Sequence, residues 1–136
     1  DVDDRQTEKN RMVESEKIYR IGCGNIMEGL HNFPSIVFWV PFNEAWGQFK
    51  TTEMVEWTMQ NDPSRLVNTA SGGNFVNVGD IIDLHNYPEP VMPNGTIFGT
   101  KQAVVLGEFG GLGLPLQGHT WQQKNWGSQS FGSADS

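Results

Sequence analysis

Two glutamates in this chain each stand directly after a short apolar run, where a carboxylate is unexpected. Glu44 follows the run Ile36–Val40 in the stretch FWVPFNEAWGQF, and Glu108 follows the run Ala103–Gly107. An ionised carboxylate is costly to bury without a partner, so each glutamate belongs at the exit of its strand or has a use there. Two neighbouring carboxyl groups can divide acid–base work when one holds a proton and the other stays ionised.

Between these two runs the chain has two more short apolar runs, and each of them also ends in polar side chains. In parallel α/β folds the active site lies at the carboxyl ends of the strands, so we expect the polar side chains to share one rim. Paired carboxylates on one rim suggest glycoside hydrolysis, in which a retaining enzyme holds its two carboxyl groups roughly 5–5.5 Å apart. The polar residues at the four strand ends are Asn43, Glu44, Asn68, Ser71, His85, Tyr87 and Glu108.

The elements that must position these residues alternate in the order helix, strand, helix, strand, loop, strand, loop, strand. Residues 4–31 lack proline and place apolar residues at mostly helical spacing, which predicts one helix that ends before Pro34. Thr51 or Thr52 could cap a second helix, which ends before Pro63. The expected strands are residues 36–40, 66–68, 80–85 and 103–107.

The strands are uniformly apolar, and no two-residue hairpin turn joins them. Both features favour a parallel sheet with crossovers, in which strands such as Ile36–Val40 are buried on both faces. The predicted fold class is therefore α/β. We expect one unit over residues 1–136, with a helix within 1–33 before the first strand and a loop-rich tail over 112–136.

Composition excludes several classes of protein. The formal net charge of −7 disfavours a nucleic-acid partner, and no apolar run approaches the roughly 20 residues of a membrane helix. The single cysteine, Cys23, rules out an internal disulfide or a cysteine metal cluster. The N-terminal DVDDRQTEKN does not fit a signal peptide. Export stays open, with a periplasmic or secreted location favoured over the cytoplasm.

No metal or other cofactor is predicted. Asp83 and His85 would supply two metal ligands, but a third ligand at plausible spacing is missing from the sequence. Glycine and tryptophan, with 16 and 5 residues, concentrate in the connecting segments and suggest loops shaped around a ligand. A tryptophan ring offers a flat apolar face that suits a sugar.

Four segments resemble, in the right order, strands four to seven of the catalytic (β/α)8 barrel of glycoside hydrolase family 2. This family lies in a clan of retaining glycosidases. The resemblance covers about residues 20–127, nearly the whole chain. The segments are PSIVFWVPFNEAWGQ (34–48), RLVNTASG (65–72), DLHNYP (83–88) and VLGEFGGLGL (105–114).

The resemblance implies a role for each residue that matches the family's pattern. Glu44 would be the general acid/base and Glu108 the nucleophile, while Asn43 would bind the sugar's 2-hydroxyl group. His85 and Tyr87 would bind the sugar or orient the nucleophile. The implied function is a retaining β-glycosidase, resembling β-galactosidase, β-glucuronidase or β-mannosidase, that hydrolyses oligo- or polysaccharides by double displacement. Further candidates for stacking or subsite contacts are Trp46, His119, Trp121 and Trp126.

A full barrel of this kind needs about 250 residues, and the four segments supply only half of its strands. An open half-barrel has two free sheet edges and an exposed interior. We therefore expect a partial barrel that the rest of a longer chain or a second copy completes. Two alternatives stay open. A non-catalytic carbohydrate-binding remnant would have no reason to keep both glutamates, and a metal-dependent barrel hydrolase would lose activity with a chelator.

Overall fold

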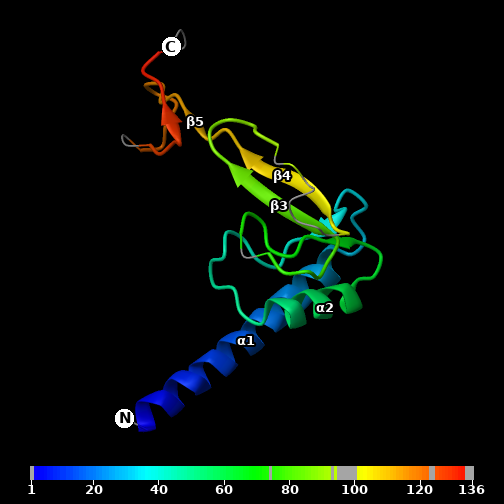
Figure 1. Cartoon of the computed structure of the whole chain (residues 1–136). Coiled ribbons are helices and arrows are strands. Elements are labelled where there is room, and N and C mark those ends of the chain that lie inside the picture. The colour runs from blue at the N-terminus through cyan, green and yellow to red at the C-terminus, as the bar shows by residue number, and fades with distance from the viewer. Residues whose placement is uncertain (1, 74, 93, 95–100, 123–124, 134–136) are drawn as a thin grey trace.

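The structure is a computed structural model, which describes residues 2–73, 75–92, 94, 101–122 and 125–133. Within these residues, two helices and six strands follow one another, and Figure 1 shows their arrangement. The helices are α1 (Val2–Leu30) and α2 (Thr51–Asn61), and the strands are β1 (Phe38–Trp39), β2 (Leu66–Val67), β3 (Ile81–Asn86), β4 (Ala103–Phe109), β5 (Leu112–Gly113) and β6 (Gln129–Ser130).

Strands β1 to β4 lie side by side in the order in which they occur in the chain. β1 pairs with β2 and β3 pairs with β4, both in parallel. A parallel bridge from Asn68 to Ile81 joins β2 to β3, and another from Asn43 to Ser71 extends the first pair. This arrangement confirms the predicted α/β class with parallel strands, and it brings the carboxyl ends of the strands to one edge.

The small core lies where α2 packs against the strands. Val67 of β2 and Val55 of α2 are both fully buried there. A neighbouring cluster joins Phe42, Met54 and Ala70, with Tyr19 of α1 stacked on the Phe42 ring at a centroid distance of 5.6 Å. α2 therefore fixes the strands from one side, and α1 contributes through a few large side chains.

The opposite face of the first strand pair is open, which corrects the prediction of a strand buried on both faces. Phe38 and Leu66 are partners in the parallel register and are 41% and 51% exposed. Successive residues of a strand point to opposite faces, so these two side chains point away from the face on which Val67 is buried. Both helices lie on one side of β3 and β4 in Figure 1, and Phe38 and Leu66 stay about half exposed among the described residues.

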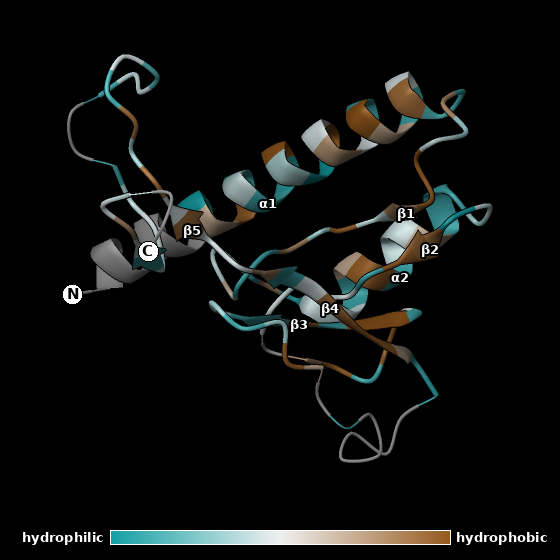
Figure 2. Ribbon diagram, turned by 90° about the horizontal axis from the view of Figure 1, so that it is seen from above, coloured by the Kyte–Doolittle hydropathy of each residue, from teal (hydrophilic) through white to brown (hydrophobic). Residues whose placement is uncertain are grey.

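Helix α1, Val2–Leu30, matches the helix predicted over residues 4–31 to within two residues at each end, and its N-terminal half extends past the other elements (Figure 1). Hydrophobic and hydrophilic residues alternate along its described part (Figure 2), and apolar side chains such as Ile18, Ile21 and Ile26 are exposed. Among the described residues, neither helix has the length and apolar character needed to cross a membrane.

One detail of the prediction is wrong. Lys50, not Thr51 or Thr52, occupies the N-cap of α2 with a left-handed φ of 38°. Thr51 is the first residue of the helix, and its hydroxyl accepts a hydrogen bond from the Gln48 amide. The tail from residue 112, predicted as loop-rich, also contains the short parallel pair β5 and β6. These two-residue strands are too short to carry an apolar pattern, so the sequence holds no signal for them.

Asp62 anchors the junction between α2 and β2. Its side chain is buried and accepts hydrogen bonds from Trp39 Nε1 at 2.9 Å, Arg65 Nη1 at 2.6 Å and the Ser64 backbone at 3.1 Å. These donors, with the Ser64 hydroxyl as the largest cause, hold the pKa of Asp62 well below its usual range. Arg65 also stacks over the Trp39 ring and donates to the backbone oxygen of Ile36, so the carboxylate organises a link from α2 to β1.

Replacing Asp62 by Asn should lower the free energy of unfolding at pH 7 by about 1.5–3 kcal/mol, because a buried guanidinium loses its charged acceptor. A folded pKa below the unfolded one stabilises the fold above about pH 4, and this contribution fades as the pH falls. Urea unfolding of both forms should therefore show a difference that narrows between about pH 5 and pH 2. Glu56→Gln, at an exposed carboxylate of the same helix, is the control. A pH-independent loss would contradict the assignment.

Candidate active site

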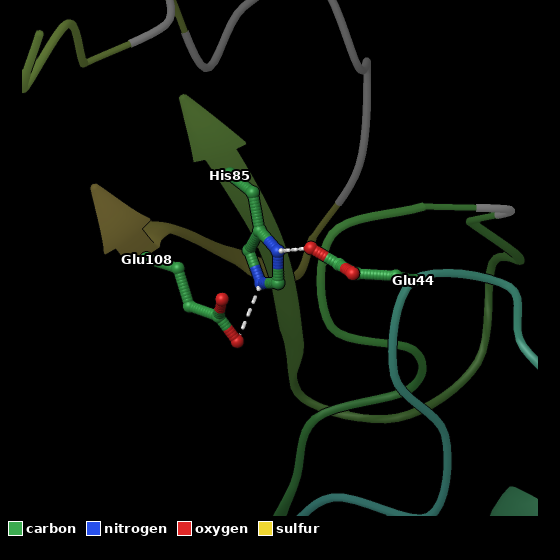
Figure 3. A group of neighbouring side chains, drawn as sticks. All are labelled: Glu44, His85 and Glu108. Carbon is green, nitrogen blue, oxygen red and sulfur yellow. Dashed lines mark hydrogen bonds and ion pairs between the residues drawn. The ribbon is translucent and has the colours of Figure 1, made fainter. Parts of the chain in front are cut away.

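Three side chains from separate elements meet at the carboxyl end of the strands (Figure 3). Glu44 follows β1, His85 lies in β3 and Glu108 lies in β4. The imidazole stands between the two glutamates: Nδ1 is 2.9 Å from Glu44 Oε1, and Nε2 is 3.4 Å from Glu108 Oε1. One oxygen of each glutamate and a ring nitrogen of His85 all lie within 4.8 Å of one another.

The three groups differ in their access to solvent. The His85 side chain is only 5% exposed, whereas the side chains of Glu44 and Glu108 are 38% and 43% exposed. The buried ring therefore has a fixed position, and both carboxylates present surface to an incoming molecule. This is the arrangement expected of two reactive groups held by a common support.

An irregularity in the sheet places His85 beside Glu108. The register runs from Leu84 opposite Leu106 to His85 opposite Glu108, so Gly107 has no partner in the ladder. A β-bulge of this kind re-aims side chains and is common next to active sites. The Gly107 backbone N–H instead donates to Asp83 Oδ1 at 2.7 Å.

The backbone at Glu44 has an uncommon conformation. Glu44 and its neighbour Ala45 have φ values of 49° and 64°, in the left-handed region, which residues other than glycine seldom adopt. The Glu44 N–H donates to the Ser71 carbonyl at 2.6 Å, and Asn43 forms a parallel bridge to the same residue. The segment after β2 thus holds the turn that carries the glutamate.

A chain of buried hydrogen bonds continues from His85 into the protein. Ser71 Oγ lies 2.8 Å from His85 Nε2 and donates to Asp83 Oδ2 at 2.7 Å. Asn68 Nδ2 also donates to Asp83 Oδ2, at 2.8 Å, and the Gly107 N–H serves the other oxygen. Asp83 and Ser71 are both buried. From the sequence, Ser71 was predicted only as a polar residue at a strand end, and Asp83 only as a possible metal ligand.

Two glycines leave the space that this chain of hydrogen bonds occupies. A Cβ at Gly72, where φ is +77°, would lie 2.4 Å from His85 Nδ1. A Cβ at Gly107 would lie 2.1 Å from Asp83 Oδ1. Both positions therefore need glycine for close approach, and neither was singled out from the sequence.

Replacing Gly72 by Ala should displace the His85 ring and break its contact with Glu44. The matched control is Gly118→Ala, because Gly118 has a similar φ of +83° and open space around it. Both variants bear the left-handed backbone cost of about 1–2 kcal/mol, but only the first should change the ring NMR signals of His85. Unchanged His85 signals in a folded Gly72→Ala chain would contradict the geometry.

Tyr87 holds the far side of Glu108. Its hydroxyl donates to Glu108 Oε2, and this hydrogen bond is the main cause that raises the pKa of Tyr87 to about 12. The phenol therefore keeps its proton at neutral pH and remains a donor. The rings of Tyr87 and His85 meet edge to face at a centroid distance of 6.3 Å, so one strand and the residue that follows it supply both contacts to Glu108.

Comparison with known families decides what kind of domain carries this site. The sequence model of the family described as glycosyl hydrolases family 2, TIM barrel domain, matches residues 5–95, which is more than half of the chain. The chain belongs to glycosyl hydrolase family 2. The match confirms the resemblance found in the sequence, and it includes Glu44 and His85, whereas Glu108 lies beyond the matched residues. A comparison with curated proteins gives no match.

The structure of this family 2 chain brings some of the predicted site residues together. Glu44, His85, Tyr87 and Glu108 are joined by the contacts above, and Asn43 is adjacent to Glu44 in the bridged turn. The remaining candidates project into solvent, so a stacking role for them stays a prediction. They are Trp46, His119, Trp121 and Trp126.

Further possible metal ligands beside His85, which the sequence spacing lacked, are present in the folded family 2 chain. Glu44 and Glu108 come from other elements, and one oxygen of each lies within 4.8 Å of a His85 ring nitrogen. These atoms already serve one another as hydrogen-bond and ion-pair partners. Sensitivity of the activity to a chelator distinguishes a metal site from a metal-free acid–base site.

Proposed function

We propose that this family 2 chain carries the catalytic centre of a retaining β-glycosidase, with Glu44 as general acid/base and Glu108 as nucleophile. The distance between the two carboxyl groups carries the proposal, because an oxygen of each lies within 4.8 Å of the other. Retaining enzymes hold these groups roughly 5–5.5 Å apart, whereas inverting enzymes need roughly 6.5–9.5 Å to admit a water molecule.

In the first step, a Glu108 oxygen attacks the anomeric carbon of the sugar and the bond to the leaving oxygen breaks. The proton of Glu44 passes to that oxygen, so the departing group leaves as a neutral alcohol. The product on the protein is a glycosyl ester of Glu108. Tyr87, which donates to the second oxygen of Glu108, orients the carboxylate for this attack.

In the second step, the ionised Glu44 removes a proton from water, and the water oxygen attacks the same anomeric carbon. The ester bond to Glu108 breaks and the electron pair returns to its carboxylate. Two inversions give net retention. Asn43 stands beside the acid/base in the bridged turn, where a hydrogen bond to the sugar's 2-hydroxyl would strengthen at the transition state.

The exposed strand face supports a barrel built from more strands than β1 to β4. Phe38 and Leu66 form a half-exposed apolar pair, and such a surface is stabilised when further strands close the sheet. We propose that these four strands are strands four to seven of a (β/α)8 barrel, completed by the rest of a longer chain or by a second copy. The substrate is a β-linked oligo- or polysaccharide.

Covalent trapping with a panel of 2-deoxy-2-fluoro glycosyl fluorides tests the proposal. Fluorine at C2 destabilises the oxocarbenium-like transition states of both steps, while the fluoride leaving group keeps the first step fast enough for the ester to accumulate. Peptide mapping should find the label on Glu108, and the sugar that labels fastest identifies the substrate class. Label on another residue would overturn the assignment. A lack of label with every sugar and no turnover would favour a carbohydrate-binding role. A lack of label with turnover that a chelator abolishes would favour the metal-dependent alternative.

A further inference from the structure

The buried hydroxyl of Ser71 fixes the direction of the hydrogen bond to His85. A hydroxyl has a single hydrogen, and Ser71 directs it at Asp83 Oδ2, 2.7 Å away. Asp83 is a buried carboxylate that also receives the Asn68 amide and the Gly107 N–H. With its hydrogen used in this way, the Ser71 oxygen can only accept a hydrogen from His85 Nε2 at 2.8 Å.

The position of Glu108 also indicates that Nε2 of His85 carries a hydrogen. Its Oε1 lies 3.4 Å from His85 Nε2, and a carboxylate oxygen also favours a hydrogen on the nitrogen that faces it. Both acceptors around Nε2 therefore agree. When the imidazole is neutral, its hydrogen is on Nε2 and the lone pair is on Nδ1.

That lone pair faces Glu44. Nδ1 lies 2.9 Å from Glu44 Oε1, and two acceptors at this distance need a proton between them. The proton belongs either to a carboxylic acid of Glu44 that donates to Nδ1 or to an imidazolium that donates to the carboxylate. In both forms Glu44 and His85 share one proton. Ser71 and Asp83, which are buried behind Nε2, keep a hydrogen on that nitrogen, so Nδ1 is the nitrogen that shares the proton with Glu44.

We infer that Ser71 and Asp83 are positioning residues that fix His85 in the tautomer with its hydrogen on Nε2, so that Nδ1 shares the catalytic proton of Glu44. The inference rests on the proposed acid/base role of Glu44. Neither residue touches a substrate, because both are buried behind the ring. Their effect reaches the reaction only through the hydrogen-bonding state of His85.

The fixed tautomer serves both steps of the double displacement. Before the first step, a lone pair on Nδ1 accepts a hydrogen bond from the acid form of Glu44 and so keeps the proton available. After that proton has left with the alcohol, the same lone pair faces the carboxylate and gives it no donor. The ionised Glu44 is then a stronger base toward water, and the proton that it removes returns to the shared position.

Loss of the Ser71 hydroxyl would allow His85 to adopt the other neutral tautomer, with its hydrogen on Nδ1. A neutral ring with its hydrogen on Nδ1 would donate to the carboxylate of Glu44 and stabilise the ionised form relative to the acid form. The other charged or titratable groups that face the ring in the described structure are Glu108 of β4, Tyr87 just after β3 and, through Ser71, Asp83 of β3. The Ser71 variant leaves all of them in place.

Imidazole nitrogen NMR of the 136-residue chain tests the tautomer without any need for activity. His85 is assigned among the three histidines by comparison with His85→Gln. Wherever the wild-type ring is neutral, Nε2 should give a pyrrole-like signal and Nδ1 a pyridine-like one. Ser71→Ala should move the population toward hydrogen on Nδ1, and Ser71→Thr, which keeps the hydroxyl, should restore the wild-type pattern. A neutral wild-type ring with its hydrogen on Nδ1 would overturn the inference.

Thr58→Val is the matched control, because Thr58 is another buried hydroxyl, bonded to the Met54 carbonyl within α2. It should cost stability without changing the His85 signals. An equal change in Thr58→Val and Ser71→Ala, or no change in a folded Ser71→Ala chain, would reduce Ser71 to a structural role.

The pH profile of the enzyme that carries this chain gives the second measurement. In Ser71→Ala the basic limb of kcat/KM should move to lower pH by about 0.5–1.5 pH units, while Thr58→Val leaves the limb in place. A uniform loss at every pH would overturn the positioning role. Failure of the proposed function is distinguishable, because it would appear as absent turnover and absent covalent label while the His85 tautomer still responds to Ser71.

Discussion

Replacing Glu108 by Gln should abolish both the turnover of β-glycosides and the covalent fluoro-sugar label. An amide is a poor nucleophile and cannot form the glycosyl ester, so kcat should fall by at least about 10⁴-fold, in line with other catalytic groups that act as a unit. Glutamine has nearly the same shape as glutamate, and its amide oxygen can still accept the hydrogen bond that Tyr87 donates. The loss should therefore come with little change in stability.

The measurement is the initial rate on an aryl β-glycoside, with intact-mass analysis of the trapped protein. Glu89→Gln is the matched control, because it changes an exposed glutamate two residues after Tyr87 and should keep both turnover and label. Residual label in Glu108→Gln at the wild-type rate would mean that another carboxylate attacks the sugar. The nucleophile assignment would then be wrong, although the family membership would stand.

The parts of the site that sequence reasoning found are those that depend on position along one strand. Glu44, His85, Tyr87 and Glu108 each stand at the carboxyl end of an apolar run, and parallel strands in chain order necessarily bring such ends to one edge. The pattern of apolar runs was therefore enough to predict four members of the cluster and the class of fold.

What the sequence did not predict depends on relations between strands. The β-bulge that sets His85 opposite Glu108 is a register shift between β3 and β4, and the sequence of either strand alone carries no signal for it. The role of Asp83 had a local signal that went unused: Asp83 and His85 are two apart in a strand and so point to the same face. Their link through Ser71, a residue from another segment, needed the fold.

The exposed face of β1 shows a second limit of prediction from the sequence, which concerns what covers a strand. A continuous apolar run indicates that a strand is buried in its functional assembly, but it does not indicate which residues cover it. Phe38 stays 41% exposed among the described residues of this chain, so the apolar pattern and the partly open face together favour a partner for that face. The apolar run therefore predicted the strand correctly but predicted a more complete burial of its side chains than the described residues of this chain provide.

The acid/base assignment predicts an uneven loss of activity, which distinguishes Glu44 from the nucleophile. In Glu44→Gln, kcat/KM should fall by about 10²–10⁴-fold for a sugar or alkyl leaving group, which needs a proton to depart. For an aryl leaving group that is already a weak base, kcat/KM should change little, because the first step no longer needs the acid. The kcat for that substrate should still fall, since the second step has lost its base, and the glycosyl ester should accumulate as a burst.

The neighbouring imidazole allows Glu44→Gln to change the acid/base group without disturbing the local structure. With the hydrogen of His85 on Nε2, the side-chain amide introduced by Glu44→Gln can donate to Nδ1 and keep the 2.9 Å contact that Glu44 makes now. Added azide should then restore turnover, because its nitrogen attacks the anomeric carbon without needing a base, and the product should be the β-glycosyl azide with retained configuration. An equal fall in kcat/KM for good and poor leaving groups, or rescue that yields the α-azide, would assign the proton transfer to another residue.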